Sequence, residues 1–278
     1  STYGDRQREP VTIAERRLIL QSEVQAALVR GGNLIIPVFA LERAQELLLD
    51  LGHLLSTNAI PQAQVFVDSP LAIRTTGVFS RYAQELEDVG YGDPFAHPAF
   101  HFVSDAVESA RLNKMSGAII LSASGMCEGG RIRHHLIHNL HRRESTVLFV
   151  GYQAKGSLGR IILDGAETVR ISGNDVRVRA QIRSIDSYSA HADQTELLEW
   201  ISQRSPIAGT LFLNHGEPEA LETMRREMQR RQPALNVRLP AIGEGFDLPP
   251  GEPASRTATG REDLIGALER DWQNAYAA

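Results

Sequence analysis

Two histidines in the last third of the chain have the spacing and neighbours of a catalytic site. They are His191, in the run Ser-Ala-His191-Ala-Asp193, and His215, in the run Asn-His215-Gly-Glu217, 24 residues further on. An imidazole on such a turn can hydrogen-bond a phosphate or protonate a leaving oxygen, and a strand-end imidazole beside glycine suits zinc. Each histidine alone fits a capping turn or a backbone-satisfied side chain equally well. Together, each beside a carboxylate, they predict one site.

Two loops rich in small residues predict contacts with an anion. One runs from Ser122 to Arg131 and contains Ser124 and Gly125, and the other is Lys-Gly-Ser157-Leu-Gly-Arg160. Small residues at the start of a helix leave backbone N–H groups free to meet an anion. The spacing matches neither a P-loop nor a dinucleotide fingerprint. Because both loops follow strands and have basic neighbours, a phosphodiester backbone is favoured over a single nucleotide. Tight turns that pack helices against a sheet are the alternative interpretation.

Three weaker features could also carry chemistry. A predicted helix carries four histidines among arginines, which favours a basic, partly solvated surface over a metal site; they are His134, His135, His138 and His141. Cys127 has no partner histidine that its spacing identifies, so a nucleophilic role is not favoured. Asp68, in Val-Asp68-Ser-Pro, either lines a cleft or forms a turn.

The composition is that of a soluble α/β protein. The 278 residues are 42% hydrophobic and 23% charged, with a formal net charge of −5 and one cysteine. No apolar run approaches the ~18 residues that span a bilayer, and a single cysteine fits a reducing compartment, so we expect a cytoplasmic location. The negative charge argues against a surface covered in nucleic-acid-binding groups, but a local basic groove needs only a few donors.

Helical and strand patterns alternate along most of the chain. Helices are predicted at 11–30, 41–55, 71–86, 105–115 and 129–140, and short apolar strands at 34–39, 64–67, 100–103, 118–121 and 147–150. This order predicts a doubly wound, mostly parallel sheet. Residues 168–171 and 176–185 alternate apolar and polar side chains, which is typical of antiparallel strands. A strand at 210–213 lies between helices at 195–203 and 217–231, and 249–260 is predicted as a loop before a C-terminal helix at 261–278.

Several ordered motifs resemble those of the β-CASP branch of the metallo-β-lactamase-fold nucleases. The resemblance covers about residues 1–248 and includes Ser1-Thr-Tyr-Gly4, Pro37-Val-Phe-Ala40 with Arg43-Ala-Gln-Glu46, Ala123-Ser-Gly-Met126, the His191 run and the His215 run. It implies a β-CASP domain at 9–186, with 1–8 and 187–278 belonging to the metallo-β-lactamase αββα fold. It further implies that His191 contacts the scissile phosphate as general acid and that His215 binds one of two zinc ions. Arg43, Ser124, Gly125, Ser157 and Arg160 would then hold RNA phosphates.

The resemblance also implies a metal cluster that these residues do not contain. The family's His-x-His-x-Asp-His motif does not occur in the sequence, and the Glu expected before Ser1 is not part of it. The chain is therefore expected to be the C-terminal portion of a zinc-dependent ribonuclease, holding zinc poorly and inactive alone. A DNA nuclease on the same scaffold and a non-catalytic RNA-binding or scaffolding member are the alternatives. A homodimer is a further expectation from the family, with the 261–276 helix as its interface.

Overall fold

The computed structural model describes residues 2, 4–86, 92–189 and 191–258. They divide into two compact units, a larger unit of residues 11–189 and a smaller unit of residues 1–10 with 190–278. These limits lie two and three residues from the predicted ends of the 9–186 domain. None of the helices in the described ranges is both long and apolar enough to cross a bilayer.

The larger unit is built on a parallel sheet of six strands. In chain order they are β1 (Leu34–Pro37), β2 (Val65–Val67), β3 (Phe100–Phe102), β4 (Ile119–Ser122), β5 (Thr146–Phe149) and β8 (Gln181–Ser184). In space the order is β3-β2-β4-β1-β5-β8, and each neighbouring pair is parallel. The mixed α/β class and the mostly parallel sheet are therefore confirmed.

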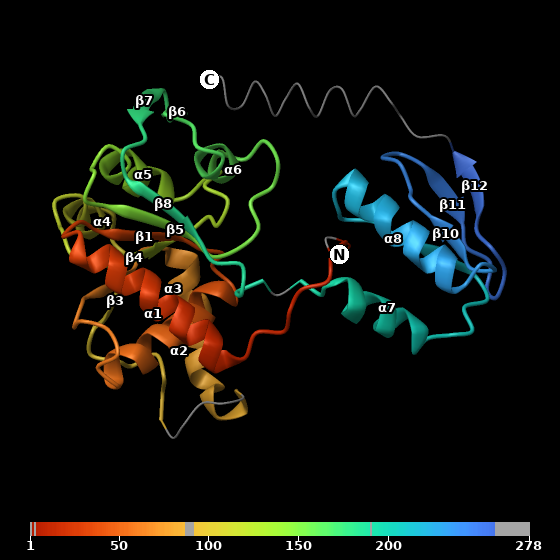
Figure 1. Cartoon of the computed structure of the whole chain (residues 1–278), viewed down its shortest axis with the longest axis horizontal. Coiled ribbons are helices and arrows are strands. Elements are labelled where there is room, and N and C mark those ends of the chain that lie inside the picture. Colours follow the sequence, from red (N-terminus) through yellow and green to blue (C-terminus); the bar gives the residue numbers. More distant parts are fainter. Residues whose placement is uncertain (1, 3, 87–91, 190, 259–278) are drawn as a thin grey trace. The chain divides into compact units, whose positions relative to one another are not determined.

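Helices cover both faces of this sheet (Figure 1). One layer comprises α1 (Ile13–Val29), α2 (Arg43–Ser56) and α3 (Pro70–Arg81), followed by the 3-10 turn η1 (Ala83–Glu85); the other comprises α4 (Ala106–Leu112), α5 (Ile132–Asn139) and α6 (Leu158–Leu163). Strand side chains alternate between the layers: Leu34 and Ile36 pack with α1 and α2, whereas Ile35 packs with α5. Both cores are fully buried, which explains why the strands read as continuous apolar runs.

Several helices begin close to their predicted positions, at residues whose side chains cap the helix N-terminus. Thr12 caps α1 in a reciprocal capping box with Glu15, and Ser69 caps α3 with Pro70 in its first turn. Asp105 likewise caps α4 by accepting hydrogen bonds from two backbone N–H groups. Such caps satisfy N–H groups that the helix itself leaves without partners.

The prediction of one antiparallel strand at 176–185 is wrong. Residues 168–177 form an antiparallel hairpin of β6 (Thr168–Ile171) and β7 (Asn174–Arg177). The extended strand is then interrupted at Arg179 and Ala180, whose N–H groups both donate to the carbonyl of Leu140. β8 continues as an edge strand parallel to β5. Its mostly exposed side chains mimic the alternation of an antiparallel strand because an edge strand has little apolar cover.

The smaller unit has its own core between two helices and short strands. Its elements are α7 (Gln194–Ser202), β9 (Thr210–Phe212), α8 (Pro218–Arg231), β10 (Asn236–Arg238), β11 (Gly245–Asp247) and β12 (Ser255–Ala258). β9, α8 and β10 form a parallel crossover unit, and Met224 and Met228 of α8 are buried against Leu213 and Val237.

The predicted loop at 249–260 contains a strand. β12 pairs antiparallel with β11, and Phe246 of β11 lies edge-on to Phe212 with ring centroids 5.0 Å apart. The backbone N–H of Ala254 donates to Thr210 Oγ1 at 2.8 Å, which ties this hairpin to β9. Ser-Arg-Thr-Ala has weak strand propensity, so pairing with β11 decides its conformation. The predicted helix at 261–278 lies outside the described residues.

Candidate functional site

The N-terminal residues of the smaller unit hold the loop that carries His215. The backbone N–H of Thr2 donates to the carbonyl of His215 at 2.9 Å, and the Thr2 hydroxyl donates to the carbonyl of Asn214. Gly216 allows this contact, because a Cβ there would lie 2.6 Å from the carbonyl oxygen of Thr2. His215 itself has φ = 55°, in the left-handed region that side chains other than glycine rarely adopt. Such a conformation persists only where the surroundings impose it, and it occurs often at functional sites.

The same N-terminal segment holds the loop that carries His191. Gly4 packs on the backbone of this loop so closely that a Cβ would lie 2.2 Å from the carbonyl oxygen of Ala192. The backbone N–H of Arg8 donates to Asp193 Oδ2 at 2.9 Å, and the Arg8 guanidinium donates to the carbonyl of His191. The N–H of Gln194 donates to the carbonyl of Arg6 at 3.1 Å. The His191 turn is therefore fixed from outside as well as by its own helix.

These contacts bring the two histidine loops together within one unit. Thr2 contacts the His215 loop and Gly4 contacts the His191 loop. These two residues are two positions apart, and two residues of chain span at most ~7 Å. Both histidine side chains are exposed. The sequence-predicted pair thus lies on neighbouring loops that share one anchoring segment, and the chemical role of each imidazole stays a prediction.

Asp193 anchors the turn that carries His191. Its carboxylate accepts a hydrogen bond from the N–H of Glu196 at 2.9 Å, and the Glu196 carboxylate accepts one from the N–H of Asp193 at 2.8 Å, forming a capping box at α7. The backbone hydrogen bonds to Asp193, from Glu196 and then from Arg8, lower the pKa of its carboxyl. The negative charge of such a carboxylate at a helix N-terminus is also stabilised by the helix dipole.

Ser124 and Gly125 lie on the larger unit, where β4 ends. The Ser124 hydroxyl accepts from the N–H of Gly129 at 3.3 Å, closing the loop on itself. Gly125 packs beneath Phe39, because a Cβ on it would lie 2.8 Å from ring carbon Cδ2 of that residue. The amide of Gln153, from the loop after β5, donates to the carbonyl of Gly125 at 3.0 Å. The loops after β1, β4 and β5 therefore form one continuous surface.

Ser157 and Arg160 lie at the start of α6 in the same surface. The Ser157 side chain is fully buried, and its hydroxyl donates to the carbonyl of Ala154 at 2.8 Å and accepts from the N–H of Arg160 at 3.2 Å. It therefore serves as a helix cap. The Arg160 guanidinium pairs with Asp164 one turn on, at 3.0 Å, and keeps about a third of its side chain exposed. RNA phosphate contact by either residue stays a prediction.

Arg43 is placed in a buried polar cluster that the sequence did not indicate. It is nine-tenths buried, pairs with Glu46, and its guanidinium lies 5.8 Å from the ring centroid of Tyr188. Burial lowers its pKa against the raising effect of Glu46. Arg43 thus has an anionic partner within the protein, and its contact with RNA stays a prediction.

Asp50 is the centre of that cluster. Its carboxylate, fully buried, accepts hydrogen bonds at 2.8 Å from Arg16 Nε, Arg17 Nε and the Tyr188 hydroxyl. Arg16 also lies over the Tyr188 ring, 4.9 Å from its centroid. Burial, then the neighbouring Asp50 charge, raises the pKa of Tyr188, so its hydroxyl stays a donor. Tyr188 is three residues before His191. The cluster therefore fixes the last residues of the larger unit, directly before the His191 loop in the sequence.

Asp68 and His135 form a second buried cluster. The sequence predicts a partly solvated histidine helix, and His134, His138 and His141 are exposed, whereas His135 is buried. Asp68 is fully buried and accepts from Arg131 at 2.6 Å and Ser109 at 2.5 Å, with His135 Nε2 at 2.6 Å. Burial alone would raise the pKa of Asp68, but these hydrogen bonds outweigh it and lower the pKa. Asp68 is therefore a core group and does not line a cleft.

Cys127 is buried in the layer of the larger unit that contains α5 and α6. Its side chain is fully covered, and burial raises the pKa of its thiol. A nucleophilic cysteine requires an accessible thiolate. This environment is consistent with the sequence-based expectation that Cys127 is not a nucleophile.

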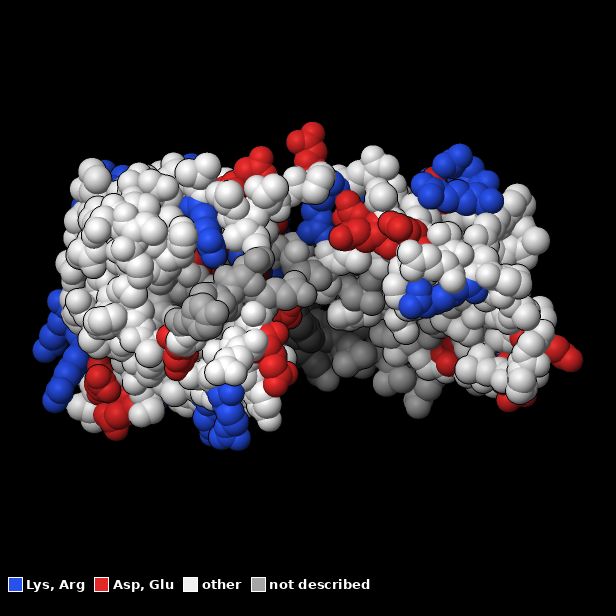
Figure 2. All heavy atoms as spheres, turned by 90° about the horizontal axis from the view of Figure 1, so that it is seen from below, with Lys and Arg blue, Asp and Glu red and all other residues white. Residues whose placement is uncertain are grey.

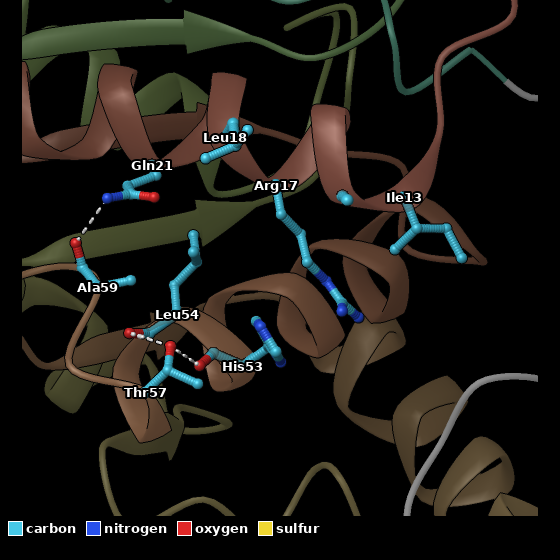
Figure 3. A pocket seen from close by; sticks show the side chains of 9 residues that line it. Ile13, Arg17, Leu18, Gln21, His53, Leu54, Thr57 and Ala59 are labelled. Atoms are coloured by element: carbon cyan, nitrogen blue, oxygen red, sulfur yellow. Dashed lines mark hydrogen bonds between the residues drawn. The ribbon is translucent and has the colours of Figure 1, made fainter.

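A shallow groove between α1 and α2 contains none of these predicted site residues (Figure 3). It has a volume of about 620 Å³ and is lined by Ile13, Ala14, Arg17, Leu18, Gln21, His53, Leu54, Thr57 and Ala59. Gln21 donates to the carbonyl of Ala59 at 3.1 Å, and Thr57 donates to that of His53 at 2.8 Å. The groove includes none of the loops at the carboxyl ends of the strands, where open α/β sheets bind ligands.

Within each unit, the face drawn in Figure 2 carries basic and acidic groups in separate patches among uncharged surface. On this face, binding of a polyanion would depend on particular contacts more than on a broad field.

Whether the chain can hold zinc depends on the side chains that it supplies as ligands. A structural or catalytic zinc takes three or four protein ligands. Among the described residues, no group of three or more His, Cys, Asp or Glu side chains gathers as a metal site would require. The described chain does not by itself fit a zinc ion, and His215 could supply only one imidazole to a shared centre.

Two family models match successive parts of the chain. The Beta-Casp domain matches residues 44–162, within the larger unit, and the Zn-dependent metallo-hydrolase RNA specificity domain matches residues 175–240, which include both histidines. With the doubly wound sheet and the paired histidine loops, these matches show that the chain belongs to the β-CASP family of metallo-β-lactamase-fold proteins.

Curated relatives come from bacteria and archaea. Ribonuclease TTHA0252 of Thermus thermophilus is 35% identical over 88% of this chain and 56% of its own length. Transcription termination factor FttA of Methanothermobacter thermautotrophicus is 32% identical over 78% of this chain and 36% of its length. An RNase J-like protein of Methanocaldococcus jannaschii is 31% identical over 78% and 51%. The chain thus spans about half, or less, of the relatives it matches.

Proposed function

We propose that this chain is part of a zinc-dependent ribonuclease that hydrolyses RNA phosphodiester bonds. The observation that carries the proposal is the pairing of the His191 and His215 loops on one N-terminal segment, with both side chains exposed. The similarity to a protein named ribonuclease and to the RNA specificity model supports RNA as the substrate. A cytoplasmic location and a homodimer belong to the same proposal.

In this proposal the two imidazoles have different tasks. His191, on the turn fixed by Asp193 and Arg8, donates a proton to the leaving oxygen of the cleaved bond, a role for which an imidazole is suited near neutral pH. His215 contributes one ligand to a zinc site completed by residues other than those described. Zinc in such a site would stabilise charge on the phosphate and activate water. Alone, the chain is expected to bind zinc weakly.

Cleavage of single-stranded RNA by the full-length protein tests the assignment. We expect His191→Ala to reduce kcat by about 10²- to 10⁴-fold, the usual contribution of a general acid, and His215→Ala to abolish most activity. His134→Ala, which removes an exposed histidine on α5, is the matched control and should leave kcat unchanged. Wild-type rates in either of the first two variants would refute the role assigned to that histidine.

The anchoring segment can be tested in the same assay. Gly4→Ala places a Cβ 2.2 Å from the Ala192 carbonyl oxygen and must displace the His191 turn, whereas Gly77→Ala on α3 meets nothing within 4 Å. We expect a large loss of kcat only in Gly4→Ala. Matched RNA and DNA oligonucleotides distinguish the ribonuclease from a DNA nuclease, and zinc-independent RNA binding without cleavage would indicate a scaffolding member.

A further inference from the structure

Two aromatic side chains are exposed at the carboxyl edge of the larger unit's sheet. Phe39 follows β1 and is 47% exposed, and Tyr152 follows β5 and is 40% exposed. Large aromatic rings normally bury most of their surface, so two exposed rings at one edge of a sheet call for a ligand or partner. Neither ring belongs to the histidine site, which lies in the smaller unit.

The sheet topology places these rings on neighbouring strands. β1 lies between β4 and β5 in the strand order, and parallel strands are ~4.8 Å apart. Their carboxyl ends therefore bring Gly125 from β4, Phe39 from β1 and Tyr152 from β5 to the same edge of the sheet, on adjacent loops. The carboxyl edge of a parallel sheet is the place where open α/β folds bind their ligands.

The Phe39 ring rests on a rigid floor. Gly125 lies directly against it, since a Cβ there would come within 2.9 Å of ring carbons Cδ2 and Cε2. The floor is fixed from behind by buried Gln153, which bonds the carbonyl of Gly125, and by the N–H of Gly159, which donates to the carbonyl of Met126 at 3.1 Å. The Cδ2–Cε2 side of the ring is therefore held against Gly125, while Phe39 as a residue stays 47% exposed.

Positive charge follows the second ring along the chain. Arg160, in the first turn of α6, keeps about a third of its side chain exposed. Lys155, on the same loop as Tyr152, is exposed. Aromatic rings beside cations are the combination with which proteins bind single-stranded nucleic acid, with bases stacked on the rings and phosphates near the cations.

We propose that Phe39 and Tyr152 form a stacking platform for nucleobases of a single-stranded RNA, with Gly125 as its floor. The proposal rests on RNA being the ligand of this protein, as proposed above. It assigns to the larger unit a binding contact with bases, in addition to any contact with phosphates. Because every base has an apolar face, the platform should bind without strong sequence preference.

Binding of two fluorescent oligonucleotides, measured by anisotropy with the whole chain, tests this platform. One is single-stranded RNA, and the other has the same length and phosphates but abasic ribose units. The wild type should bind the base-bearing RNA more tightly. Phe39→Ala should weaken that binding about 5- to 150-fold, the effect of losing one stacked base, and leave the abasic strand unaffected. Tyr152→Ala should act in the same direction.

Tyr82→Ala is the matched control, because Tyr82 is 50% exposed at the end of α3 and away from this edge. It should behave as the wild type. Equal binding of the two oligonucleotides by the wild type would overturn the platform while leaving the proposed ribonuclease intact, and would favour a protein partner for the rings. Retention of the base preference in both Phe39→Ala and Tyr152→Ala would also overturn it. RNA cleavage by the full-length protein tests the proposed function separately.

Discussion

Replacing Asp50 by asparagine should destabilise the larger unit far more than breaking a surface ion pair. The carboxylate is fully buried and accepts three hydrogen bonds, two of them from the guanidinium groups of Arg16 and Arg17. Asparagine keeps the size of the side chain but removes the charge, and its NH₂ group would face a donor. Removing one partner of a buried ion pair typically costs about 3–5 kcal/mol, because the other charge is left buried.

The two arginines moderate this cost. Their side chains are 17% and 24% exposed, so each can regain some contact with water. We therefore expect a loss of about 3 kcal/mol in the free energy of unfolding, at the lower end of that range. For a unit of this size, one kcal/mol corresponds to about 2–4 °C in Tm, which predicts a decrease of about 6–12 °C.

Thermal unfolding followed by far-UV circular dichroism measures this change. Asp164→Asn is the control, since it breaks an ion pair with Arg160 in which the two side chains are 58% and 36% exposed. Exposed pairs contribute at most about 1 kcal/mol, so its Tm should fall by no more than ~4 °C. If Asp50→Asn melted with the control, the buried cluster would carry no net stability and the reasoning from its burial would be wrong.

Two further predictions concern buried titratable groups. Hydrogen bonds hold the pKa of Asp68 below its unfolded value, so its contribution to stability is complete above about pH 4 and is lost as pH falls through the folded pKa. In urea unfolding, the free energies of the wild type and Asp68→Asn should differ at pH 7 and converge in acid. A difference that stayed constant with pH would contradict the lowered pKa. Cys127 is the only cysteine and burial raises its pKa, so a thiol reagent at pH 8 should label the chain only after denaturation, and rapid labelling of the folded protein would show that the site is open.

The sequence predicts the larger unit well because its signals are local. Apolar runs bounded by Gly31-Gly32 and by Pro37 mark β1, and capping residues mark the helix starts. A buried parallel sheet requires such runs on every strand, so the fold class follows from them. Apolar runs do not predict β8, because it is an edge strand. They do not predict β12 either, because pairing with β11, and not its own residues, makes it extended.

The candidate site is predicted in part, because convergence in space leaves little trace in a sequence. The His191 and His215 runs are recognisable as motifs, but their meeting depends on Thr2 and Gly4, which are far from both loops along the chain. Phe39 offered one available signal, an aromatic residue directly after a buried strand. Asp50 offered a weaker signal, since it lies between Leu47 and Leu54 on the apolar face of its helix, but its arginine and tyrosine partners are far away along the chain.

The Asp50 cluster has a consequence for how this architecture can change over evolution. It joins Arg16, near the beginning of the larger unit, to Tyr188, at its end. A domain whose two ends are held close together can be deleted, enlarged or exchanged during evolution. The flanking segments of the chain then need only a short linker to join them. A version of the chain with residues 11–189 replaced by a few glycines and serines should therefore still allow the flanking segments to fold together.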